Sequence, residues 1–213
     1  PDIVLLYNWL PQTISGHDEN DTFWFPDTTW SITRLAQCYA MQNDWYMYDT
    51  AGERVPEWFG WAANWTRHCP LGTYGTSVGM TYAEWLVEVA APRFVNGEAD
   101  WEPWGFDSYA YQGFHLEIMA DCVGSYGFDY TDCDPDRDGI AEGVYRTCTQ
   151  GGDQDPLSVL YREVNDEFGP AFEQLIGDRM IVIINSGNKY IAPACHTSMT
   201  AQKLESWLST PPH

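Results

Sequence analysis

The sequence predicts an α/β fold built on a parallel sheet, because four apolar segments of strand length alternate with helical patterns. The four segments are residues 3–9, 44–49, 113–121 and 180–187. Each is a nearly continuous apolar run, which is typical of strands that are buried on both faces of a parallel sheet. Strands that alternate with helices along the chain indicate the same fold class.

Helical patterns fill the spaces between these segments. The first covers residues 30–39. The second begins at Thr81, which with Glu84 has the spacing of a capping box, a motif in which side chain and main chain cap each other at the start of a helix. The third covers residues 155–177 and contains Pro170, which is expected to kink or split the helix.

Long segments rich in Gly, Trp and Asp lie between these elements, and three of the four directly follow an expected strand. They cover residues 10–26, 50–80, 96–112 and 122–154. In parallel α/β folds, the loops at the carboxyl ends of the strands carry the functional site. A ligand is therefore expected to bind at the long segments that follow the expected strands.

The charge of the chain excludes several classes of partner. The 213 residues include 31 acidic and 10 basic side chains, which gives a formal net charge of −21. Such a surface will not bind nucleic acid through basic patches and will avoid anionic membranes. No apolar run is long enough for membrane insertion as a spanning helix. With 44% hydrophobic and 15% aromatic residues, the chain can still bury a core as one domain.

One short segment, residues 130–148, concentrates acidic side chains in a pattern typical of a calcium loop. Counted from the first ligand, oxygens stand at positions 1, 3, 5, 7 and 9, and Gly139 at position 6 permits a sharp turn. Position 12 is Tyr145 instead of the glutamate of an EF-hand, so the pattern predicts a Ca²⁺-binding insertion of another kind. The alternative is a solvated acidic turn. The expected ligands are Asp134, Asp136, Asp138, the main-chain carbonyl of Ile140, and Glu142.

Six cysteines and two glycosylation sequons indicate a secreted or cell-surface protein. No two cysteines form a C-x-x-C pair, which argues against a structural zinc site. An even number of cysteines, a calcium-type loop and N-x-T sequons at Asn20 and Asn64 suit an extracellular setting. Cys133 and Cys148 bracket the acidic loop and are expected to form a disulfide, whereas the other pairings stay open.

Four motifs, taken in order, resemble the glycosyl-hydrolase-like (β/α)8-barrel family, a group of predicted secreted glycosidases. The motifs are DWYMYDTAGERVPEW (44–58), NWTRHCP (64–70), GFHLEIMADC (113–122) and MIVIINSG (180–187). The resemblance implies a single (β/α)-barrel-type domain that lacks parts at one or both ends, with a parallel sheet and long loops braced by disulfides and calcium. Where the family has an aspartate at the end of a strand, this chain has Glu117.

The resemblance and the carboxylates together predict a glycoside hydrolase. Hydrolysis of a glycosidic bond needs two carboxyl groups that flank the bond. Glu117, at the end of an expected strand, is the first candidate, and Asp49 or Asp121 would be the second. Asn185, which ends another expected strand, would bind a sugar hydroxyl or cap the strand end. The alternative for Glu117 is a buried carboxylate with a structural partner.

Tryptophans in or beside the expected loops favour a carbohydrate ligand, since the C–H faces of sugar rings stack on indoles. The expected platforms are Trp9, Trp58 and Trp61. The substrate would be a polysaccharide or oligosaccharide. The alternative is a non-catalytic carbohydrate-binding or structural protein on a degenerate barrel, whose partners are its own copies or other chains of a larger extracellular complex.

Overall fold

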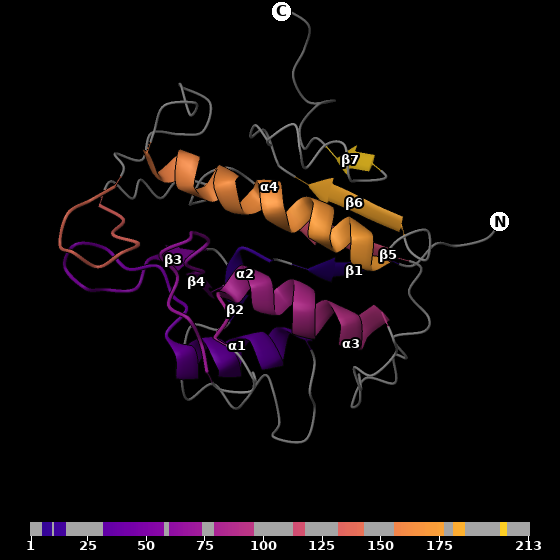
Figure 1. Cartoon of the computed structure of the whole chain (residues 1–213), viewed down its shortest axis with the longest axis horizontal. Coiled ribbons are helices and arrows are strands. Elements are labelled where there is room, and N and C mark those ends of the chain that lie inside the picture. The colour runs from indigo at the N-terminus through magenta and orange to yellow at the C-terminus, as the bar shows by residue number, and fades with distance from the viewer. Residues whose placement is uncertain are drawn as a thin grey trace, which may run out of the picture.

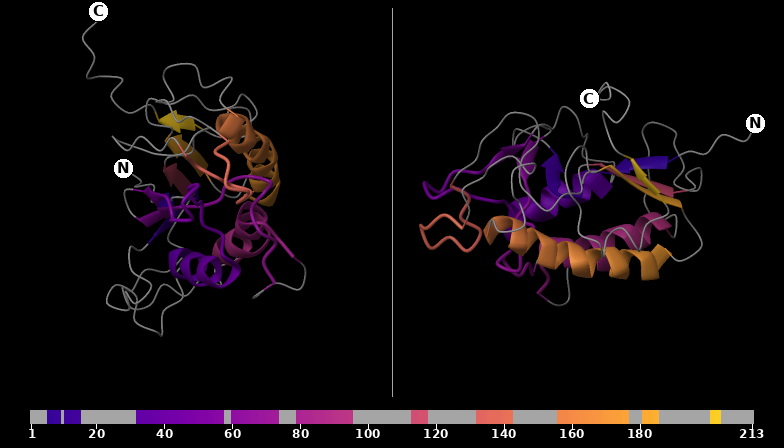
Figure 2. Two further views of the ribbon diagram at one scale, coloured as in Figure 1. Left: turned by 90° about the vertical axis from the view of Figure 1, so that its left-hand side faces the viewer. Right: turned by 90° about the horizontal axis from the view of Figure 1, so that it is seen from above.

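The computed structural model of the chain describes residues 6–9, 11–15, 32–57, 60–73, 79–95, 113–117, 132–142, 156–176, 181–185 and 201–203. These residues form two sheets and a group of helices, drawn as coloured ribbons in Figure 1 and from two further directions in Figure 2. One sheet is parallel and the other is antiparallel.

The parallel sheet has four strands in the order β1-β5-β6-β7. Three of its strands come from segments in which apolar runs predict strands, and these three pair in parallel as expected. The fourth, β7, is short and polar, and the sequence does not predict it. The strands are β1 Leu6–Trp9, β5 Gly113–Glu117, β6 Ile181–Asn185 and β7 Ala201–Lys203.

The antiparallel sheet comes from the first third of the chain. Its strand order is β2-β4-β3, with β2 Thr13–Ser15, β3 Pro56–Glu57 and β4 Gly60–Ala62. Residues 44–49, which the apolar run predicts as a parallel strand, instead fold back as a hairpin beside this sheet. Tyr46 bridges Ala63, and Tyr48 bridges Arg54, both in antiparallel pairs.

The hairpin reverses direction at residues 49–53 for local reasons. The Asp49 carboxylate accepts hydrogen bonds from the main-chain N–H groups of Ala51 (3.0 Å) and Glu53 (2.8 Å). Gly52 has a φ of +79°, a left-handed conformation that glycine adopts without a steric penalty. A nearly continuous apolar segment therefore pairs with its own neighbour in the sequence instead of a distant strand.

The predicted (β/α) barrel is therefore wrong. The described strands form an open parallel sheet, with β1 and β7 at its two edges, and a separate antiparallel sheet. The expected disulfide bracing is not found among the described cysteines, since no disulfide joins any two of Cys38, Cys69 and Cys133. Cys148 lies outside the described residues, so the Cys133–Cys148 pair stays a prediction.

All three helical segments begin close to where the sequence places them. Helix α1 covers Ile32–Asn43. Helix α2 covers Tyr82–Trp85 and continues through the π-helical turn η1, Leu86–Ala90, into α3, Ala91–Val95. The predicted capping box is confirmed, because the Glu84 N–H donates to Thr81 Oγ1 (3.4 Å) and the Thr81 N–H donates to the Glu84 carboxylate (2.7 Å).

Helix α4 is longer and covers Pro156–Ile176. It is a single helix of 21 residues, so Pro170 does not split it. In Figure 1, α4 runs alongside the continuous helix formed by α2, η1 and α3, and it contacts all three segments. No helix in the described part of the chain combines the length and the apolar character needed to cross a membrane.

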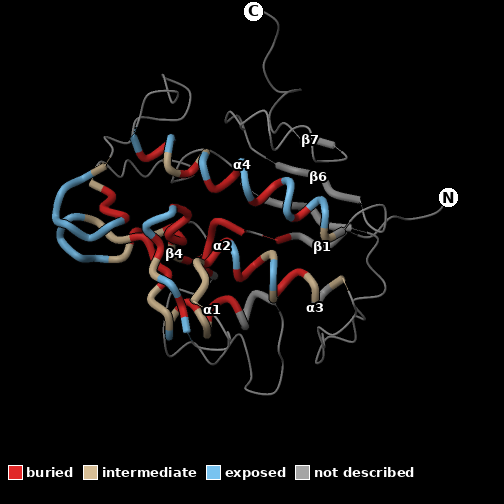
Figure 3. The backbone as a smooth tube through the Cα atoms, in the orientation of Figure 1, coloured by how far each residue is buried: buried red, intermediate tan, exposed pale blue. Residues whose placement is uncertain are grey.

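The core beneath these helices is rich in aromatic rings. Trp45, Trp65 and Trp85 are fully buried. Figure 3 draws the buried residues of the chain in red. The ring of Trp45 lies 5.8 Å from that of Trp85, and the ring of Trp65 lies 5.0 Å from that of Phe168. The Trp65 indole N–H donates to the side-chain oxygen of buried Asn165 at 2.8 Å, so its polar atom is satisfied inside the core.

Replacing Gly72 by alanine should destabilise the protein by about 1–3 kcal/mol, the usual effect of overpacking a tight site. Gly72 is buried, and a Cβ there would overlap the Trp45 ring and lie 2.6 Å from Asn43 Cγ. Gly79→Ala is the matched control, because the nearest atom to its new Cβ is Cβ of exposed Leu71, at 3.1 Å. Denaturant unfolding measures both variants, and equal stability of the two would contradict this packing.

Candidate functional site

Residues 132–142 form a loop in which four carboxylates converge. Each offers one oxygen, and these oxygens lie within 4.8 Å of one another. With Ca²⁺–oxygen distances of about 2.3–2.6 Å, ligands on opposite sides of an ion are roughly 5 Å apart, so this spacing fits one coordination sphere. The structure thus brings together a group that could hold a metal ion. Its members are Asp134, Asp136, Asp138 and Glu142.

Hydrogen bonds from the main chain to the aspartates fold this loop. The two carboxylate oxygens of Asp134 accept from the N–H groups of Asp138 (3.1 Å) and Gly139 (2.8 Å). Asp138 accepts from the N–H of Ile140 (2.8 Å). Gly139 makes the sharp turn with a φ of +87°. The Ile140 side chain is exposed, and its carbonyl stays a predicted ligand.

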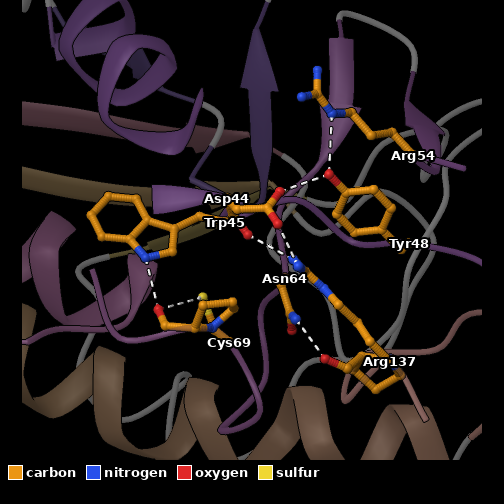
Figure 4. Close-up of polar contacts among 9 residues, drawn as sticks. Asp44, Trp45, Tyr48, Arg54, Asn64, Cys69 and Arg137 are labelled. Atoms are coloured by element: carbon orange, nitrogen blue, oxygen red, sulfur yellow. Dashed lines mark hydrogen bonds and ion pairs between the residues drawn. The ribbon is translucent and has the colours of Figure 1, made fainter. Parts of the chain in front are cut away.

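Arg137 ties the loop to the hairpin (Figure 4). Its guanidinium forms an ion pair with the Asp44 carboxylate and also donates to the Asp44 main-chain carbonyl at 2.7 Å. It also lies over the Tyr48 ring, 4.4 Å from the centroid, and the Tyr48 hydroxyl donates to Asp44 at 2.6 Å. Burial is the main cause that raises the pKa of Tyr48, so this hydroxyl keeps its proton and remains a donor. An exposed ion pair alone would stabilise little, but here a carboxylate, a carbonyl and a ring hold one guanidinium.

Two further hydrogen bonds fix the loop from other sides. The carbonyl of Tyr48 accepts from the N–H of Asp134 at 2.8 Å. The buried side chain of Asn64 donates to the carbonyl of Pro135, also at 2.8 Å (Figure 4). Asp134 is consequently only 3% exposed. The first predicted ligand is therefore fixed on a rigid support before any ion binds.

Glu142 is the carboxylate that most needs a cation. Its Oε2 is buried and has no hydrogen-bond partner among the described residues. Burial raises the pKa of this carboxyl, and the negative charges of Asp136, Asp134 and Asp138 raise it further. A bound cation would supply the missing partner and reverse the effect of these neighbours.

A second group of polar residues lies at the carboxyl end of the parallel sheet. Glu117 ends β5 and is paired in register with Asn185, which ends β6. Asn185 is paired in turn with Lys203 at the end of β7. Since neighbouring strands are about 4.8 Å apart, the three residues occupy one row at an edge where parallel α/β folds bind ligands. Nothing in the sequence around Lys203 marks a strand, so sequence analysis missed it.

The two candidates for a second catalytic carboxylate are not placed in this row. Asp49 lies in the turn of the hairpin, where its carboxylate accepts the main-chain N–H groups described above and its main chain bridges Cys133. It therefore neighbours the acidic loop. Asp121 lies outside the described residues, and its role stays a prediction.

The structure describes two of the three expected sugar platforms. Trp9 is 3% exposed and packs against Phe172, with 6.2 Å between ring centroids, so it offers almost no surface to a sugar. Trp61 is half-buried in β4. Trp58 lies outside the described residues. The sequence could not show that Trp9 is buried and Trp61 only half-buried, because a tryptophan can serve either the core or a ligand site.

Glu142→Gln is expected to raise the stability of the metal-free protein at neutral pH and to reduce the stability that the protein gains from Ca²⁺. Because the pKa of Glu142 is raised in the folded protein, metal-free stability falls as the pH rises from 4.5, the ordinary value, through the raised pKa. Glutamine removes this loss, so the free energy of unfolding in EGTA should rise at neutral pH. With Ca²⁺, the variant lacks one of the four carboxylates that could hold the ion, and it should gain less stability from the ion.

Denaturant unfolding between about pH 4 and pH 8, in EGTA and in Ca²⁺, measures both effects of Glu142→Gln. Glu173→Gln, on the exposed side of α4, is the matched control and should change neither. A Glu142→Gln variant that is less stable than the parent protein in EGTA at neutral pH would contradict the electrostatic account.

Known proteins add no further evidence about the site. No protein family, no curated protein and no solved structure matches this chain. The resemblance to glycosyl-hydrolase-like barrels is therefore carried by the four short motifs alone. Function has to be inferred from the acidic loop at 132–142 and from the row of residues at the carboxyl edge of the parallel sheet.

Proposed function

We propose that this chain binds Ca²⁺ through residues 134–142. The observation that carries the proposal is the convergence of four carboxylate oxygens within 4.8 Å. Ca²⁺ takes six to eight hard oxygen ligands in a flexible geometry, which suits carboxylates, a main-chain carbonyl and water. Mg²⁺ needs a tighter octahedron, and Zn²⁺ prefers nitrogen and sulfur ligands, so both fit this oxygen set less well. The proposed ligands are the four carboxylates and the carbonyl of Ile140.

The proposed ion has a structural role. It would offset half of the charge of the four carboxylates and fix a loop that contacts the hairpin through Arg137 and Asp134 and contacts Asn64 through Pro135. Binding to the folded state alone would stabilise loop and hairpin together by mass action. Calcium sites of extracellular modules have dissociation constants of about 0.1–1 mM. A site of this affinity would be filled in the secreted or cell-surface setting that the sequence predicts.

Saturating Ca²⁺ should raise the melting temperature above that in EGTA, with about 2.7 kcal/mol of added stability when free Ca²⁺ is one hundred times the dissociation constant. Asp136→Asn should lose most of this gain, since asparagine can still accept the hydrogen bond from the Asp138 N–H (3.2 Å) but carries no charge. Asp166→Asn, on the exposed face of α4, is the matched control. Calorimetry measures the shift, and identical melting in EGTA and Ca²⁺ would refute the proposal.

We propose as a second function that the carboxyl edge of the parallel sheet binds a polysaccharide or oligosaccharide, with Glu117 as the acid or base of glycoside hydrolysis. The register of Glu117 with Asn185 favours it. A glutamate in register with an asparagine could provide a proton carrier and a partner for a sugar hydroxyl. Asp121, four residues after Glu117, is the proposed second carboxylate. Binding without cleavage is the alternative form of this proposal.

Glu117→Gln should lower turnover of a cleaved polysaccharide by about 10²-fold or more and leave binding intact, because glutamine keeps the shape of the side chain but cannot transfer a proton. A panel of polysaccharides, tested for retention on the protein and for released reducing ends, measures both. Glu173→Gln is again the matched control. Retention without cleavage, unchanged in Glu117→Gln, would support a binding protein, whereas neither retention nor cleavage would exclude both forms.

A further inference from the structure

A groove with an apolar floor lies between α4 and the helix formed by α2 and η1. Its volume is about 340 Å³. Val164, Phe168 and Ala171 line one side of the floor, and their spacing of three and four residues places them on one face of α4. Ala83 and Val87 line the opposite side of the floor. The two helices thus present apolar side chains to the same space.

The apolar surface extends to the mouth of the groove. Leu71 lines it there and is 66% exposed. A single exposed leucine is ordinary, but a leucine that continues an apolar floor marks a surface suited to binding. The volume lies at the lower end of the range for ligand pockets, about 300–1,000 Å³, and therefore suits a small ligand.

Carboxylates dominate the charge around this groove. Of the four charged residues that line it, Glu84, Glu88 and Glu167 are acidic and Arg67 is basic. Arg67 is already paired with Glu167 and with Glu163 (3.5 Å). Glu84 and Glu88 form no ion pair within the described part of the chain. They lie four residues apart, where like charges on a helix repel, so a cation bound between them would relieve that repulsion.

We propose that this groove binds a small organic cation with an apolar body, an amine or guanidine carried on an aliphatic or aromatic chain. The body would lie on the floor formed by Val87, Val164 and Phe168, and the cationic group would lie between Glu84 and Glu88. The net charge of −21 on the whole chain attracts such a ligand from solution. This site is separate from the proposed calcium loop and does not depend on it.

Three probes of one shape test the proposal: 4-phenylbutylamine, 4-phenylbutanol and 4-phenylbutyrate. They differ mainly in being cationic, neutral and anionic at neutral pH. Titration calorimetry of the full chain in constant Ca²⁺ should show the tightest binding for the amine. The alcohol should bind roughly three- to thirtyfold more weakly, as two exposed charge interactions would provide. The advantage of the amine should shrink at high salt.

Variants test whether the probes bind in this groove. Glu84→Gln with Glu88→Gln should remove the preference for the amine over the alcohol, and glutamine at position 84 still completes the capping box. Ala171→Trp places a large ring into the groove from an exposed position and should abolish binding of both probes. Glu173→Gln, which removes a charge from α4 outside the groove, should change nothing.

The outcomes separate a site from general attraction to an acidic protein. Equal binding of amine and alcohol, or amine binding that survives Ala171→Trp, would overturn the proposal. Contacts between the probe ring and the methyl groups of Leu71, Val87 and Val164, seen as nuclear Overhauser effects in the unmodified protein, give a measurement that does not depend on how any variant folds. Their absence at saturating amine would overturn the proposal as well.

Discussion

The convergence of four carboxylates on one point is the constraint that the described structure has to satisfy. Like charges at this spacing repel, so main-chain N–H groups and the support of the hairpin must hold them. The contacts that do so bridge distant parts of the chain, since 93 residues separate Arg137 from Asp44. Residues 44–49 consequently form main-chain hydrogen bonds with residues 54–63 and with the acidic loop. Because these neighbours take up their main-chain groups, residues 44–49 do not join the parallel sheet.

Features that depend on neighbours in the sequence could be predicted. The alternating aspartates from Asp134 onwards place their carboxylates together because the loop is closed by bonds within a few residues, and the structure retains that group. The capping box of Thr81 and Glu84 is equally local. The acidic cluster and the start of the second helical segment therefore needed no knowledge of the tertiary fold, only of residue spacing within a few positions.

Features that depend on distant pairing could not be predicted in the same way. The apolar run indicates that the middle of this segment, residues 45–47, is buried, but it does not say whether its partner is a distant parallel strand or the next segment of chain. Lys203 joins the row of Glu117 and Asn185 only through strand register, which no local signal encodes. Trp9 illustrates the same limit, because burial against Phe172 follows from packing and not from residue type.

The hydrogen bond from Asn64 to Pro135 also determines whether the sequon at this position can be used. The side-chain nitrogen that would carry a glycan is the donor of that bond, and Asn64 is 1% exposed. Its side-chain oxygen accepts a hydrogen bond from the Thr66 hydroxyl at 2.6 Å, so both polar atoms of the Asn64 side chain are engaged within the folded protein. An oligosaccharyltransferase could reach Asn64 only before the chain folds, and a glycan added then would leave no room for the acidic loop. The order of folding and glycosylation would therefore decide whether the acidic loop can pack against Asn64.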